Sequence, residues 1–164
     1  MPFFCLFLKD IIILMKEKYI VKNKKAYFDY EILERYEAGI VLTGAEIKQV
    51  RAKNVQLNGS YVKVLLGKTK KPELFAVNIN IAKSVDPSRT RKLLMHKKEI
   101  QSLIGKVEQK KLTLVPLKIY LKKNRLAKVL IGLVRGRKKH DKRQVLRERD
   151  QKRQAQRAIR NYKY

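Results

Sequence analysis

The stretch AYFDYEILERYEAGIVLTGAEIKQVR, residues 26–51, contains the two patterns that decide the fold. Residues 26–41 are rich in aromatic and branched side chains, which predicts extended structure. A short helix is predicted to follow, because Thr43 can cap its first turn and Glu46, three positions later, completes a capping box. Val50 lies on the apolar inner face of this helix. The fold is therefore expected to open with a long strand and a short helix.

A hairpin and a second helix are predicted next. Residues 60–67 and 73–81 flank a polar connector that contains a proline, which is typical of a β-hairpin. Apolar residues within 89–107 then recur at helical spacing, at least from His96 onward. Gly105 is suited to the C-terminal cap of this helix.

A second hairpin is predicted over residues 111–136, with its turn near Lys123 and Asn124. Pro116 lacks an N–H group, which places its strand at a sheet edge or at a bulge. The order strand, helix, strands, helix, strands within about 110 residues is typical of a small closed or half-closed barrel. The predicted fold class is mainly β with short helices: an OB-like antiparallel β-barrel of about six strands with flanking helices.

The charge of the chain points to a polyanionic partner. The sequence has 41 Lys and Arg against 14 Asp and Glu, a net charge of +27, far outside the range usual for a soluble enzyme. Self-repulsion of this size destabilises a compact state unless a polyanion is close by. Nucleic acid is the first candidate for that partner, and an anionic membrane is the second.

Much of the positive charge lies in the C-terminal tail. Residues 135–164 contain 13 Lys and Arg against 3 Asp and Glu, with few apolar side chains. Such a segment cannot bury enough apolar surface to fold by itself. It is rich in helix-forming residues, so a helix that forms against a partner is expected. We therefore divide the chain into an N-terminal extension (1–19), a barrel (20–135) and a basic tail (136–164).

The apolar N-terminus is interpreted as an extension. Lys9 and Asp10 interrupt its apolar run, and neither piece approaches the roughly 20 residues that span a bilayer. The charge order and cleavage site of a signal peptide are missing. Residues 1–14 are therefore expected to be a non-functional extension, with Met15 as the real start. An amphipathic membrane anchor is the alternative.

Catalytic and metal-binding motifs are missing from the sequence. Its serines lie in no nucleophile-elbow or SxxK context, and no phosphate-binding glycine motif occurs. The single cysteine, Cys5, excludes an internal disulfide, and two histidines are too few for a His-based metal site. We therefore predict no enzymatic activity, no metal and no cofactor, in a reducing, cytoplasmic setting.

Aromatic side chains lie among the basic ones, and two interpretations stay open. Small barrels bind RNA by stacking bases on surface aromatics, but alternation along a strand also places about half of such rings in the core. The rings are Tyr27, Phe28, Tyr30, Tyr36, Tyr61 and Tyr120. The nearby carboxylates Glu31, Glu34 and Glu37 are expected to be solvated or salt-bridged on a strand face.

The segment KNKKAYFDYEILERYEAGIVLTGAEIKQVR resembles the N-terminal signature of the small protein B family, the SsrA-binding (tmRNA-binding) proteins of bacteria. DPSRTRKLLMHKKEI, TLVPLKIYLKKNRLAKV and GRKKHDKR match the same family in the same order. The resemblance covers about residues 20–155 and rests on long, ungapped motifs.

The resemblance implies an OB-like barrel that binds the tRNA-like domain of tmRNA. The protein would deliver tmRNA, with elongation factor Tu and GTP, to ribosomes stalled without a complete codon. Its tail would be disordered when free and helical on the ribosome. There it would occupy the empty mRNA channel beside the decoding centre of the small subunit and its rRNA. The resemblance further implies a monomer that is not an enzyme.

The family's motifs also imply the RNA contacts. For tmRNA these are Asn23, Lys24, Lys25, Glu37, Tyr61, Arg89, Arg91, Lys92, Leu94, Lys128, Arg135, Gly136, Arg137 and Lys138. For the decoding centre they are His140, Asp141, Lys142 and Arg143. Lysines and arginines would neutralise phosphates, Glu37 would bind a base edge or orient an arginine, and Tyr61 would stack.

The sequence departs from the family pattern in places, and other function classes stay open. The loop between Ile81 and Asp86 is shorter than usual, and Asp150 stands where some members have tryptophan. A structural ribosomal or rRNA-binding protein is the main alternative, and an RNA-processing enzyme is the other. The DKR tail on a barrel with the EAG and RKLLM motifs favours the tmRNA-binding protein.

Overall fold

The structure is a computed structural model, and it describes residues 19–66, 71–84, 86–110, 112–122 and 126–161. The predicted N-terminal extension therefore lies outside the described residues, apart from Tyr19. The predicted turn at Lys123 and Asn124 lies outside them as well.

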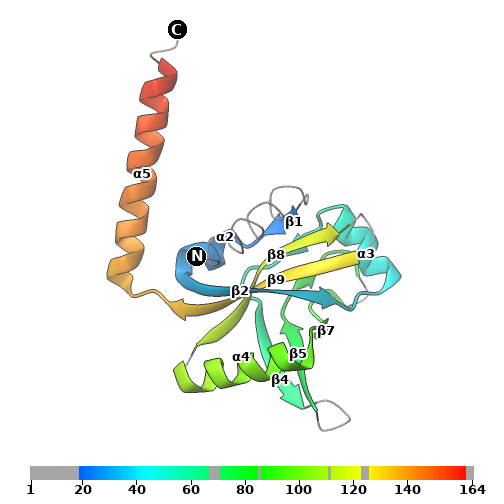
Figure 1. The fold of residues 1–164 in the computed structure, drawn as a ribbon. Helices are drawn as coiled ribbons and strands as arrows, with labels where there is room; N and C mark the ends of the chain where they lie inside the picture. The colour runs from blue at the N-terminus through cyan, green and yellow to red at the C-terminus, as the bar shows by residue number, and fades with distance from the viewer. Residues whose placement is uncertain (1–18, 67–70, 85, 111, 123–125, 162–164) are drawn as a thin grey trace, which may run out of the picture.

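Six antiparallel strands form a closed ring, in the order β8-β4-β5-β7-β2-β9 and back to β8 (Figure 1). Strand β1 extends the sheet from β8, and β3 and β6 form a separate pair. The strands are β1 Tyr19–Lys22, β2 Tyr30–Ile40, β3 Val55–Gln56, β4 Tyr61–Leu66, β5 Pro72–Val77, β6 Asn80–Ile81, β7 Arg91–Leu94, β8 Thr113–Lys122 and β9 Leu126–Gly136. The predicted barrel of about six antiparallel strands is confirmed.

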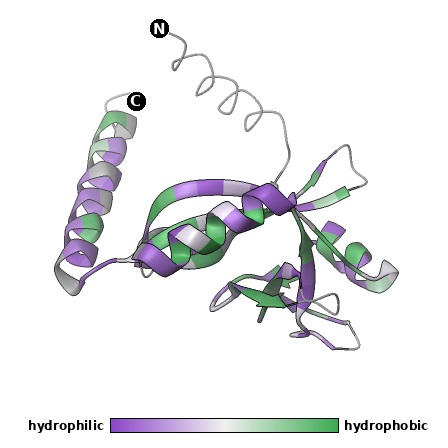
Figure 2. Ribbon diagram, turned by 60° about the horizontal axis from the view of Figure 1, so that its bottom comes forward, coloured by the Kyte–Doolittle hydropathy of each residue, from purple (hydrophilic) through white to green (hydrophobic). Residues whose placement is uncertain are grey.

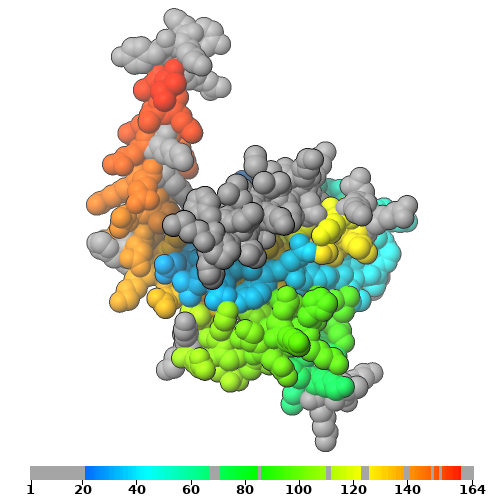
Figure 3. Space-filling view, viewed as in Figure 1, coloured from blue at the N-terminus to red at the C-terminus, as the bar shows by residue number. Residues whose placement is uncertain are grey.

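The helices flank this barrel. Helix α4 packs across it and contributes Ile100 and Leu103 to the main core, whereas α5 projects away from the body (Figures 1 and 3). A second, smaller core lies under α2, where Ala26 packs with Leu117 and Val134. The helices are α2 Lys24–Asp29, α3 Gly44–Arg51, α4 Lys97–Lys110 and α5 Lys139–Asn161.

The prediction for the opening stretch is confirmed for the long strand, which is β2, and for the short helix, and it is wrong only at the start. Thr43 and Glu46 form the predicted capping box, and Val50 on α3 is fully buried. Residues 24–29, however, are helical and not extended. The reason is local, because the Asn23 side chain accepts the N–H of Ala26 and caps a short helix. Long-range packing of Ala26 then holds that helix on the sheet.

The predicted helix over residues 89–107 is confirmed only in its second part. Residues 91–94 form β7, because pairing with β2 and β5 overrides the helical spacing. Helix α4 begins at Lys97, as the periodicity from His96 indicated. Gly105 lies inside α4 and does not end it, a position that costs roughly 1 kcal/mol relative to alanine. The predicted bulge at Pro116 is confirmed by the register shift between Pro116 and Lys118.

The basic tail is helical over α5, although little of it touches the barrel. Lys142 pairs with Asp29 of α2, while Leu146 and Ile159 are exposed. Figure 2 shows a mostly hydrophilic helix with no continuous apolar face. The structure thus shows the tail in its helical form, and the dependence of that form on a partner stays a prediction.

Hydrogen exchange would test this dependence directly. In the free protein we expect the amides of α5 to exchange within about tenfold of unfolded-chain rates, because an isolated helix without packing is marginal. Helix α4 is the internal control, since Leu103 anchors it in the core. Equal protection of α4 and α5 would show that the tail helix needs no partner.

Candidate RNA-binding surface

The two ends of the barrel sequence meet beside α2. Strand β9 ends against the start of β2, where Gly136 pairs with Tyr30. The backbone N–H of Arg137 then donates to the carbonyl of Asp29 at 3.0 Å. This register gathers exposed or half-exposed cations, which we name the α2 patch: Lys24, Lys25, Arg135, Arg137 and Lys138. Five candidates that lie in two distant sequence segments therefore form one basic surface.

Gly136 lies in the middle of the α2 patch. A side chain at this position would meet nothing within 4 Å, so packing inside the protein does not require glycine there. The close approach of RNA to the backbone that the family motif implies at Gly136 stays a prediction.

Asn23 is placed inside the protein rather than on the patch. Its side chain is 3 % exposed, and its amide nitrogen donates to the carbonyls of Leu57 and Pro116 at 2.9 and 3.0 Å. Its amide oxygen accepts the N–H of Ala26. Through these hydrogen bonds Asn23 fixes α2 on the barrel, and the RNA contact expected from the sequence stays a prediction.

A second group lies farther along β2, which we name the barrel patch: Glu37, Leu94, Tyr120 and Lys128. The Glu37 carboxylate accepts hydrogen bonds from Tyr120 of β8 and Lys128 of β9. Burial acts to raise the pKa of Glu37, but these hydrogen bonds and the charges of Lys128 and Lys122 hold it below its ordinary value. The carboxylate is therefore ionised at neutral pH and fixes the lysine.

Leu94 joins the barrel patch through strand pairing. It lies opposite Gly39 of β2, which in turn lies opposite Lys128 of β9. A Cβ atom on Gly39 would lie 3.3 Å from the Leu94 Cβ, so the glycine lets this apolar side chain lie close against β2. Leu94 is 53 % exposed and offers a flat apolar surface beside Lys128. At about 3.3 Å per residue, the two patches lie roughly 20 Å apart along β2.

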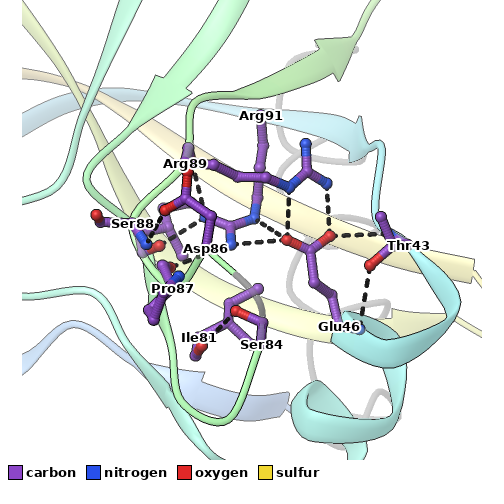
Figure 4. Close-up of polar contacts among 10 residues, drawn as sticks. Thr43, Glu46, Ile81, Ser84, Asp86, Pro87, Ser88, Arg89 and Arg91 are labelled. Carbon is purple, nitrogen blue, oxygen red and sulfur yellow. Dashed lines mark hydrogen bonds and ion pairs between the residues drawn. The ribbon is translucent and has the colours of Figure 1, made fainter.

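The candidates Arg89 and Arg91 both bind one buried carboxylate (Figure 4). Arg91 donates from Nε and Nη2 to Oε1 of Glu46 at 3.0 and 2.8 Å. Arg89 donates from Nε and Nη2 to the two Glu46 oxygens at 2.7 and 2.5 Å. Burial acts to raise the pKa of Glu46, but the hydrogen bonds from Arg89, the Thr43 backbone and Arg91 lower it to about 2.

Arg91 lies inside the protein, unlike Arg89. Its side chain is 0 % exposed, whereas that of Arg89 is 32 % exposed. Arg91 also donates to the carbonyls of Ile79, Arg89 and Pro87. A guanidinium group enclosed in this way acts as a structural ion-pair partner in the protein alone, and its contact with tmRNA stays a prediction.

The remaining candidates are spread over other parts of the surface. Lys92 pairs with Glu73 at 2.6 Å and lines, with Leu94, a pocket between β5, β7 and α4. Tyr61 is half-buried at the start of β4, with the Lys63 ammonium 5.5 Å from its ring centre. Lys92 lies two residues before Leu94 of the barrel patch on β7, whereas strand pairing does not bring Tyr61 beside either patch.

The decoding-centre candidates lie in the first turn of α5. The Asp141 carboxylate accepts the backbone N–H of Lys138 at 3.1 Å, which caps the helix start. Lys142 donates to Asp29 at 2.7 Å, and Arg143 is exposed. His140 is in the same turn, and its side chain lies outside the described atoms.

The surface offers cations that could contact phosphates, together with apolar and aromatic groups that could contact bases. Within the described ranges, no group of three or more His, Cys, Asp and Glu side chains could hold a metal ion. No helix there is long and apolar enough to cross a membrane. Fixed cations beside apolar and aromatic groups suit RNA, whose backbone and bases they can contact together.

Comparison with known proteins agrees with this surface. The chain matches the profile of the family described as SmpB protein over residues 20–161. The chain belongs to the SmpB protein family. It is 47% identical over 152 residues to the SsrA-binding protein of a Nitratiruptor species, covering 89% of this chain and 99% of that protein. It is 44% identical over 157 residues to the SsrA-binding protein of Mycoplasma mycoides subsp. mycoides SC, covering 91% and 100%.

A solved structure supports the same placement. The fold is similar to a chain in the structure described as "tmRNA-SmpB: a journey to the center of the bacterial ribosome", with a TM-score of 0.58 and 49% sequence identity. The match covers 73% of this chain and 85% of that one. The resemblance to the SsrA-binding family that the sequence motifs indicated is therefore confirmed.

Sequence reasoning missed the roles of several residues at or beneath this surface. From the sequence, Tyr120 was only one of several aromatic rings, whereas in the structure its hydroxyl group donates to Glu37. Glu46 was predicted only as a helix cap. Lys118 is half-buried, and burial together with the charges of Lys22 and Arg35 lowers its pKa. The pairing of β1 with β8 places Lys22 directly opposite Lys118.

Proposed function

We propose that this protein binds tmRNA and acts in trans-translation, the rescue of stalled ribosomes. The observation that carries the proposal is the match to the tmRNA–SmpB structure at 49% identity over 85% of that chain. SsrA-binding relatives at 44–48% identity, aligned over most of the chain, support the same function. The SmpB family consists of RNA-binding proteins and not of enzymes.

The barrel and the tail have separate partners in this proposal. The barrel binds the tRNA-like domain of tmRNA, with the α2 patch and the barrel patch as its RNA contacts. The tail lies as a helix in the empty mRNA channel of the small subunit, where the first turn of α5 reaches the decoding centre. The spatial separation of α5 from the barrel in Figure 3 supports this division.

Three further parts of the proposal concern the setting. The protein acts as a monomer, delivers tmRNA together with elongation factor Tu and GTP, and works in the cytoplasm, where ribosomes translate. A structural ribosomal protein is the second candidate, and the relatives and the structural match do not favour it.

A competition experiment tests the central proposal. Binding of the full chain to the tRNA-like domain of tmRNA is measured with excess bulk tRNA, at low and at physiological salt. Binding that survives both the competitor and the salt is expected from shape-specific recognition. If the affinities of the protein for the tRNA-like domain and for bulk tRNA fall equally, the attraction is only the generic effect of the protein's net charge, and the proposal fails.

The Lys128→Ala substitution tests the barrel patch. We expect weaker binding to the tRNA-like domain, and a salt dependence whose slope, in log K against log salt, falls by about 1, because one phosphate contact is lost. Lys106→Ala is the matched control, since Lys106 also pairs with a strand β2 carboxylate, that of Glu34, at 2.6 Å. An unchanged slope in Lys128→Ala would place this lysine away from phosphate.

A further inference from the structure

The cluster of Glu46, Arg89 and Arg91 has two arginines for one carboxylate, although Arg91 alone is enough to pair with the buried Glu46. Arg91 alone already binds Glu46 through two N–H groups, and its other donor atom, Nη1, reaches the carbonyls of Ile79 and Arg89. Glu46 and Arg91 are both almost fully enclosed, at 2 % and 0 % exposure. They form a neutral pair, which is the composition that a buried ion pair requires.

Arg89 binds the same Glu46 carboxylate from the protein surface. Its guanidinium group uses Nε and Nη2 on the Glu46 carboxylate, in the two-point geometry that fixes the plane of an arginine. Figure 4 shows the third nitrogen of Arg89 pointing away from Glu46. With a third of its surface exposed, the side chain presents this free edge to solvent.

The loop that carries Arg89 is held by the same cluster. Arg91 donates to the carbonyls of Pro87 and Arg89, so the backbone on both sides of Ser88 is tied to the buried pair. Asp86 is the nearby acidic group, and its carboxylate accepts the N–H of Ser88 within the loop. The Arg89 backbone and side chain are therefore both fixed by contacts within the protein itself.

We infer that Glu46 and Arg91 are positioning residues for RNA binding, which hold Arg89 ready to contact a phosphate of the bound RNA. This inference rests on the proposed function. A long arginine side chain loses substantial rotational freedom when it binds, and fixing it beforehand removes that cost from the binding step. One edge of the guanidinium binds Glu46, and the other is left for the phosphate, which arginine can contact in a fixed orientation.

The inference separates the two arginines that the sequence treated alike. Arg91 acts inside the fold, and Arg89 acts on the RNA. Glu46 links them, because it caps α3 through the Thr43 N–H and binds both guanidinium groups. The RKLLM motif, which begins with Arg91, and the capping box, which contains Glu46, therefore both support the contact of Arg89 with RNA. About 45 residues separate them in sequence.

The test is a double-mutant cycle with the tRNA-like domain of tmRNA as the probe. Arg89→Ala is expected to weaken binding by about tenfold and to lower the salt slope by about 1, while the melting temperature changes little. Glu46→Gln keeps the shape and the capping acceptor, and is expected to weaken binding by a smaller factor. In the double variant the two losses should not add, because Glu46 acts on RNA only through Arg89.

Two further variants keep the test decisive if Glu46→Gln folds poorly. Arg89→Lys keeps the charge but cannot hold the carboxylate and the phosphate in one plane, so it should recover only part of the lost affinity. Lys48→Ala removes an exposed charge from α3, the helix that carries Glu46, and is the control for generic attraction. It should leave the salt slope of RNA binding nearly unchanged.

Three outcomes would overturn the inference. Unchanged affinity and slope in Arg89→Ala would remove Arg89 from the RNA contact. Full recovery in Arg89→Lys, or losses that add in the double variant, would remove the positioning role of Glu46. The failure of the proposed function itself looks different, since then the unmodified chain would not prefer the tRNA-like domain over bulk tRNA.

Discussion

A chain that ends at Lys138 is expected to bind the tRNA-like domain of tmRNA with nearly unchanged affinity and to show no detectable tagging on stalled ribosomes. The cut removes α5 and keeps Arg137, whose N–H holds α2. The loss to the barrel is the Lys142–Asp29 ion pair, which is half-exposed and therefore worth about 0–1 kcal/mol. An affinity change within about fivefold follows from that energy.

The readouts are binding of the tRNA-like domain and tagging of a nascent chain on ribosomes programmed with a truncated message. Ala155→Pro is the matched variant, because it keeps every charge of the tail and breaks α5 in its interior, at a cost of about 3 kcal/mol to the helix. We expect it to lose tagging and to bind tmRNA normally. Parallel loss of binding and tagging in both variants would contradict the division between barrel and tail.

The barrel could be predicted because its signals are local. The capping box at Thr43 and Glu46, the two hairpins and the bulge at Pro116 each depend on residues close in sequence. Helix 24–29 could not be predicted in the same way. Its residues favour extended structure, and the helix is stabilised by Asn23 through hydrogen bonds to Leu57 and Pro116, far along the chain.

The candidate site was predicted in its residue types and less well in its arrangement. The matched motifs indicated Lys24 and Arg137 together, and the hydrogen bond from the Arg137 N–H to Asp29 holds Arg137 against α2, the helix that begins at Lys24. Motif matching treats all residues of a motif alike, so it could not separate Arg89 from Arg91. Arg91 is the first residue of β7 and is buried against Glu46 of α3, whereas Arg89 lies in the loop before β7. This difference depends on a contact with a helix that is distant in sequence.

Arg91→Met is expected to lower the free energy of unfolding by about 3–5 kcal/mol, the range for breaking one side of a buried ion pair. The substitution removes the Arg91 donor from the carbonyls of Ile79, Arg89 and Pro87. The Pro87 carbonyl still accepts the N–H of Ile81, and Glu46 keeps Arg89 as its remaining guanidinium partner. Urea unfolding followed by circular dichroism measures the effect. Arg89→Ala is the control and should cost less than about 1 kcal/mol, since its side chain lies partly in solvent. Equal costs for the two substitutions would contradict the buried, structural role of Arg91.

The same cluster predicts how stability depends on pH. The folded pKa of Glu46 is about 2, below the ordinary value of 4.5, so its contribution to stability is fully present above pH 4.5 and is lost as the pH falls toward 2. A shift of this size corresponds to about 3 kcal/mol. Glu46→Gln cannot titrate at this position, so the difference in unfolding free energy between it and the unmodified chain should be constant above about pH 5 and shrink steadily below. Because other carboxylates titrate equally in both proteins, this difference isolates Glu46. A difference that stays constant down to pH 2 would show that the carboxylate does not hold the two arginines in its charged form.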